Sequence, residues 1–114
     1  MNIPAPLSSF DPDVLRQRIV ALGHDWADAN GAAELLEESR KSVLAQYALK
    51  MPGKSMAERE SMALACEEYR EHFRAMVSAR TKANRARVEY DAARTWVDLV
   101  RSMESTRRME AGLR

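Results

Sequence analysis

The chain has 114 residues, of which 31% are charged and only 6% are aromatic, and its 18 Lys and Arg nearly balance its 17 Asp and Glu. This length fits one domain, and the composition favours helices around a thin core over a β-sheet. The formal charge of +1 excludes a strong overall attraction to nucleic acid or membranes, and the single cysteine excludes an internal disulfide.

Residues 1–10 are predicted to form a flexible N-terminal arm that precedes a single helical domain over residues 11–114. Pro4 and Pro6 resist helix formation in this arm. Its larger apolar side chains are Ile3, Leu7 and Phe10. The arm either frays at the terminus or clasps a neighbouring subunit, and Phe10 also suits the hydrophobic staple of the helix that follows.

A first helical arm is predicted to begin with Asp11 as its N-cap and Pro12 as its first helical residue. Apolar residues then recur in steps of four and three, a heptad seam typical of coiled coils. The seam residues are Leu15, Ile19, Leu22, Trp26, Ala29, Ala33, Leu36, Val43 and Tyr47. Asn30-Gly31 lies inside this pattern, and because the register continues across it we expect a kinked arm rather than two helices.

The first arm is predicted to end at Met51-Pro52-Gly53-Lys54, because proline and glycine favour a turn. Ser55 and Glu58 match a capping box that starts the second helix. No proline or glycine follows until Gly112, so one very long, unbroken second helix is expected.

Two helices joined by this turn would form an antiparallel helical hairpin. A hairpin centred on the turn would bring Leu36 near Arg70 and Trp26 near Arg80. A heptad seam continued from Met62 to Met76 would place arginines in the core, so the sequence favours an eleven-residue step instead. The residues of that step are Cys66, Val77, Val88 and Leu99, with Ala92 and Met103 beside them.

Near its C-terminal end the second helix carries an apolar arc wider than one partner helix can bury. We therefore expect a homo-oligomer, dimeric or higher, with an interface of Trp96, Val97, Leu99, Val100 and Met103. The predicted fold class is all-α: an antiparallel helical hairpin with a kinked first arm and a very long second helix, coiled-coil-like and assembled as an oligomeric bundle.

The segment from Arg80 to Arg87 holds four positive charges, and no acidic residue lies between Glu71 and Glu89. The candidate phosphate contacts are Arg74, Arg80, Lys82, Arg85 and Arg87. Two alternatives to phosphate binding stay open. Acidic residues of the first arm could neutralise the segment, and arginines spaced seven apart could pair with Asp91 and Asp98 along the helix.

The sequence shows no pattern that indicates catalysis. Residues His24 and His72 lie far apart, Cys66 falls on the predicted apolar seam, and neither a glycine-rich phosphate loop nor a catalytic serine motif occurs. We expect a non-enzymatic protein without metal or cofactor. Without a membrane-spanning apolar run or a secretory signal, we expect it in the cytoplasm and not in a membrane.

The C-terminal region contains the run ARVEYDAARTWVDLVRS at residues 86–102, followed by Arg107-Arg108. This run resembles the tail of small all-helical accessory proteins encoded by bacteriophages and prophages. The resemblance implies an accessory role in phage DNA metabolism, such as recombination, or in host takeover, and it implies no functional residue. The candidate partners are DNA, RNA, a nucleic-acid enzyme, or another host or phage protein. The alternative is a purely protein-binding coiled-coil adaptor or inhibitor.

Overall fold

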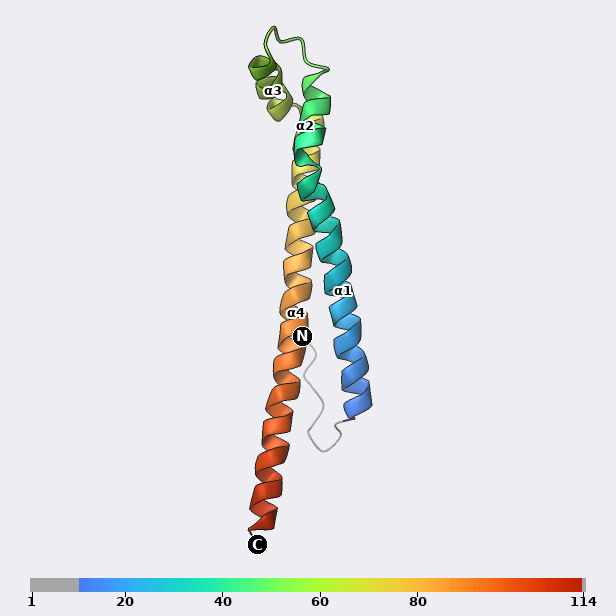
Figure 1. Cartoon of the computed structure of the whole chain (residues 1–114), viewed down its shortest axis with the longest axis vertical. Helices are drawn as coiled ribbons and strands as arrows, with labels where there is room; N and C mark the ends of the chain where they lie inside the picture. The colour runs from blue at the N-terminus through green and yellow to red at the C-terminus, as the bar shows by residue number, and fades with distance from the viewer. Residues whose placement is uncertain (1–10, 114) are drawn as a thin grey trace. The chain divides into compact units, whose positions relative to one another are not determined.

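The computed structural model describes residues 11–113, and the regular structure in that range is α-helical (Figure 1). The helices are α1 (Pro12–Glu38), α2 (Arg40–Ala48), α3 (Met56–Ala65) and α4 (Glu67–Gly112). The prediction of an all-α fold is confirmed. The predicted N-terminal arm, residues 1–10, lies outside the described residues.

The chain divides into two compact units. Unit 1 contains Met1–Trp26 and Ala86–Arg114, and unit 2 contains Ala27–Arg85. Helices α1 and α4 each contribute a stretch to both units. The single domain expected over residues 11–114 stays a prediction.

Helix α1 begins where the sequence predicts. The backbone N–H of Asp13 donates to Asp11 Oδ1 at 2.9 Å, so Asp11 is the N-cap. The helix continues through Asn30-Gly31, so the predicted kink does not break it, but the expectation of a single helix in the first arm is wrong. The interruption comes instead at Ser39, whose hydroxyl donates to the carbonyl oxygen of Leu36 at 3.1 Å. Such a bond competes with the helical pattern and explains the boundary between α1 and α2.

The turn after α2 also follows the sequence, with one difference in its capping. Ser55 Oγ accepts a hydrogen bond from the backbone N–H of Glu58 at 3.1 Å, which confirms Ser55 as the N-cap of α3. The Glu58 carboxylate, however, accepts from the backbone N–H of Lys54 at 2.8 Å rather than from Ser55. Arg59 Nε closes the turn by donating to the carbonyl oxygen of Gly53 at 2.7 Å.

The prediction of one unbroken second helix is wrong, because the chain bends at Cys66. This residue has an extended backbone, with φ −74° and ψ 150°, and it separates α3 from α4. Helix α3 packs against α2 (Figure 1), and Ala48 of α2 and Ala63 of α3 are both fully buried. Tertiary packing of this kind overrides the helix propensity of a stretch that lacks proline and glycine.

The seam predicted for the first arm is confirmed. All nine of its residues, from Leu15 to Tyr47, are buried or half-buried. Large apolar side chains at heptad spacing made this pattern visible in the sequence.

The eleven-residue seam predicted for the second helix is wrong. Val77, Val88 and Leu99 are 49%, 67% and 50% exposed. The buried and half-buried positions of α4 instead keep steps of three and four, as a heptad seam does. The residues of this seam are Tyr69, His72, Met76, Ala79, Ala83, Ala86, Tyr90, Ala93, Val97 and Val100, and the other half-buried residues of α4, namely Arg80, Trp96 and Glu104, lie beside it or beyond it. Alanines carry the seam through the middle of α4, and each arginine of the seven-residue series up to Arg101 lies beside it rather than in it.

Candidate functional site

In unit 1, the contact between α1 and α4 is built from aromatic rings. Trp26 and Tyr90 are stacked, with ring centroids 5.7 Å apart and an interplanar angle of 25°. The Tyr90 ring lies against Gly23, where an added Cβ would stand 3.2 Å from Tyr90 Cε2, so glycine permits this close approach. The guanidinium of Arg87 lies 5.8 Å from the centroid of Trp26, a cation–π distance.

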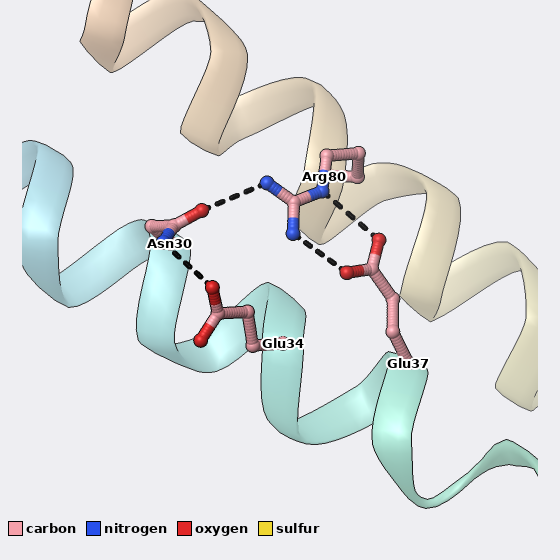
Figure 2. Close-up of polar contacts among 4 residues, drawn as sticks. All are labelled: Asn30, Glu34, Glu37 and Arg80. Carbon is pink, nitrogen blue, oxygen red and sulfur yellow. Dashed lines mark hydrogen bonds and ion pairs between the residues drawn. The ribbon is translucent and has the colours of Figure 1, made fainter.

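In unit 2, the corresponding contact is polar and centres on Arg80 (Figure 2). Arg80 of α4 donates from Nε and from a terminal nitrogen to the two carboxylate oxygens of Glu37 on α1, at 2.9 and 2.6 Å. Its other terminal nitrogen donates to Asn30 Oδ1 at 2.8 Å. The Asn30 amide in turn donates to Glu34 Oε1 at 3.1 Å. We call these four residues the Arg80 clamp.

The clamp uses the planar fork geometry in which guanidinium and carboxylate bind most specifically. The hydrogen bonds from Arg80 lower the pKa of Glu37 below its ordinary value, and those to Glu37 raise the pKa of Arg80. Both side chains remain about one-third exposed. Arg80 is therefore engaged within its own chain, which limits its use as a phosphate contact.

The pairing differs from the expected register by about ten residues, since Arg80 meets Glu37 and Trp26 stacks on Tyr90 rather than lying near Arg80. The expected register assumed that the return helix begins directly after the turn. The 10 residues of α3 are instead used to pack against α2, and α4 begins only at Glu67.

The other predicted phosphate contacts fall into two groups. Arg74 forms an ion pair with Glu67, and Arg87 lies 3.7 Å from Asp91, four residues further along the helix, as the alternative of intrahelical pairing predicted. Lys82 and Arg85 are exposed, and among residues 11–113 neither has a carboxylate within 4 Å. Two of the five candidate cations are thus unpaired in the described part of the chain.

The five predicted interface residues also separate into two groups. Val100 is only 2% exposed, and Val97 and Val100 line the same groove as residues at the start of α1. Trp96 is half-buried, whereas Leu99 and Met103 are 50% and 47% exposed. Together with Ala92, these last three residues follow steps of four, three and four, so they share one face of α4. We call Ala92, Trp96, Leu99 and Met103 the second stripe.

No family model, curated protein or solved structure matches this chain. Conclusions about function therefore depend on its own geometry. Within residues 11–113, no three His, Cys, Asp or Glu side chains are grouped so as to hold a metal ion. In the same range, none of the helices combines the length and the apolar character needed to cross a membrane.

Asn30 is the residue of the clamp that sequence reasoning missed, because its pairing with Gly31 suggested only a kink. A signal was nevertheless present. Asn30 and Glu37 are seven residues apart and each directly follows a seam residue, Ala29 or Leu36. Polar residues at such flanking positions pair across the seam in coiled coils, and Arg80 holds the equivalent position after Ala79.

Proposed function

We propose that this chain is a non-enzymatic, protein-binding helical adaptor, an antiparallel hairpin with coiled-coil-like seams that assembles with further copies into an oligomeric bundle. The second stripe is the observation that carries the proposal. One seam of α4 is used within the chain, and the stripe repeats the same spacing beside it with Leu99 and Met103 about half exposed. An apolar face at heptad spacing is what a helix offers to another helix.

Sedimentation equilibrium over a range of concentrations tests the assembly. Wild type should exceed the 12.9 kDa of a single chain, and Leu99→Lys should return the mass to that value, because a buried lysine charge would oppose the contact. Ser105→Lys is the matched control, since Ser105 lies on α4 of the same unit, is exposed and is not three or four residues from any residue of the stripe. A wild-type chain that stays monomeric throughout, or equal effects of the two lysines, would remove the proposal.

Nucleic-acid binding is the second candidate, as a phage-type accessory role acting on DNA, RNA or a nucleic-acid enzyme. Lys82 and Arg85 support it, since both are exposed and neither forms an ion pair among residues 11–113. With two phosphate contacts on double-stranded DNA, the logarithm of affinity should fall against the logarithm of salt concentration with a slope of about −1.8, whereas five contacts would give about −4.5.

Fluorescence anisotropy with DNA and RNA at low and moderate salt separates the two candidates. Lys82→Glu with Arg85→Glu should abolish binding, while Arg70→Glu, an exposed substitution elsewhere on α4 of unit 2, should leave it nearly intact. Equal loss with both variants would indicate only a response to net charge, and absence of binding at low salt would eliminate this candidate. Co-purification that survives nuclease treatment would favour the protein-binding function.

A further inference from the structure

Unit 1 contains an apolar groove of about 670 Å³ between the first turns of α1 and the C-terminal part of α4. Its apolar lining residues are Pro12, Leu15, Ile19, Val20, Val97 and Val100. Its charged lining residues are Arg16, Arg101 and Arg108 together with Asp13 and Glu104. Val20 remains 50% exposed, so part of this apolar surface faces solvent. An exposed concave apolar surface of this kind is a suitable binding site for an apolar segment.

A segment of suitable composition directly precedes α1 in the sequence. Residues 1–10 contain no Asp, Glu, Lys or Arg, although 31% of the whole chain is charged. The segment joins α1 at Asp11, next to Pro12, which itself lines the groove. Its apolar side chains are Ile3, Leu7 and Phe10. An uncharged, apolar segment attached at the edge of an apolar groove reaches it at a high effective concentration.

The reach of the segment also fits. Pro12 and Val20 are eight residues apart on α1, which corresponds to about 12 Å of helix. Ten extended residues span up to roughly 33 Å, so the segment is long enough to turn back and follow the groove. Pro4 and Pro6 favour an extended backbone, which needs no partner strand.

The capping geometry of α1 indicates the direction from which the preceding residues would enter the helix. With Asp11 as N-cap, Phe10 holds the preceding position and Leu15 the fourth helical position, the pair that forms a hydrophobic staple. Leu15 lines the groove. A staple between Phe10 and Leu15 would therefore aim the preceding residues at the groove rather than away from it.

We propose that residues 1–10 fold back onto the groove of their own chain, with Phe10 on Leu15 and with Leu7 and Ile3 covering Ile19 and Val97. The arginines at the groove then donate to the carbonyl groups of the extended segment. This assignment differs from an arm that clasps a neighbouring subunit, and it is independent of the second stripe, which the groove does not include.

Paramagnetic relaxation enhancement tests the proposal on the full chain. In a Cys66→Ser background, Ser8→Cys carries a nitroxide, and amide signals are compared with those after reduction of the label. Ile19, Val97 and Val100 should lose most of their intensity. In the Leu7→Ser, Phe10→Ser variant the same signals should recover, while circular dichroism should show unchanged helix content because both substitutions precede Pro12, the first residue of α1.

A mixture of isotope-labelled chains without nitroxide and unlabelled chains with nitroxide shows whether the loss of signal arises within one chain or between two chains. Signals in the groove should keep their intensity in this mixture if each segment covers its own chain. Broadening that persists in the mixture would assign the groove to a second copy and overturn the proposal. Weak broadening spread evenly over the chain in the unmixed sample would overturn it as well.

Discussion

The two units join their helices with different side chains. In unit 1, the contact relies on large groups, namely the stacked rings of Trp26 and Tyr90 and the buried Val100. In unit 2, the buried residues are Tyr69 and four alanines, Ala33, Ala48, Ala63 and Ala83. Interaxial distance depends on the side chains at the contact, so alanines allow helices to approach closely.

This difference explains why arginines of one series, spaced seven apart on α4, have two roles. In unit 2 the small seam residues leave Arg80 within reach of Glu37, and it forms a bidentate ion pair across the seam. In unit 1 large rings occupy the seam, and the guanidinium groups lie on them, Arg87 over Trp26 and Arg94 over Tyr90. Arg80, Arg87 and Arg94 each follow a seam alanine, so the groups within reach decide the partner: Glu37 in unit 2 and the aromatic rings in unit 1.

Enlarging an alanine of unit 2 should break its close packing and gives the largest expected effect. Ala83 is 1% exposed, so Ala83→Leu has no room for the added methyl groups and should cost about 3 kcal/mol of unfolding free energy. Urea denaturation followed by circular dichroism measures this. Ala75→Leu is the matched control at an exposed position of α4 in the same unit, and it should change stability little. Equal effects would show that the alanines are not a tight seam.

Removing the aromatic pair should destabilise unit 1 because the contact between its helices loses the stacked rings. Tyr90→Ala should cost about 2 kcal/mol, because the half-buried ring loses its contacts with Trp26 and Gly23. A double-mutant cycle with Trp26→Ala should give a coupling of about 1 kcal/mol, the usual contribution of stacked rings. Additive single effects would mean that the two rings do not stabilise one another.

The same contrast accounts for what the sequence revealed. Large apolar residues made the seam of α1 and α2 recognisable in the sequence from Leu15 to Tyr47, and capping residues located the starts of α1 and α3. The seam of α4 was missed because alanine is a weak periodic signal and because exposed Val77 and Val88 suggested a false one. The bend at Cys66 could not be predicted locally, since it results from α3 packing on α2. That bend also shifted the register and hid the partners of Arg80.

Alanine substitutions at two glycines of unit 2 test where its residues pack closely and where they do not. A Cβ at Gly53 would stand 3.0 Å from the backbone nitrogen of Arg59, so Gly53→Ala should force the turn to shift and cost about 1 kcal/mol. Gly31 lies inside α1 with nothing within 4 Å of the added atom, so Gly31→Ala should stabilise by up to about 1 kcal/mol. Thermal melts of both variants show whether each substitution raises or lowers the melting temperature. A stabilising Gly53→Ala would show that the turn is loose.

The smallest expected effect concerns the Arg80 clamp, whose partly exposed groups are screened by solvent. Because hydrogen bonds from Arg80 lower the pKa of Glu37 from 4.5, the ionised carboxylate is favoured in the folded state. The resulting stabilisation is complete above the unfolded pKa and is lost as pH falls through the lower folded value. The difference in melting temperature between wild type and Glu37→Gln should therefore hold steady from about pH 7 to about pH 5 and shrink below about pH 4.5.

Glu38→Gln is the control, because it removes a neighbouring acid that has no ion pair among residues 11–113. This variant should melt close to wild type at neutral pH. A difference for Glu37→Gln that persists unchanged into acid would mean that the carboxylate charge does not contribute to the clamp, and unit 2 would then be held by its alanines alone.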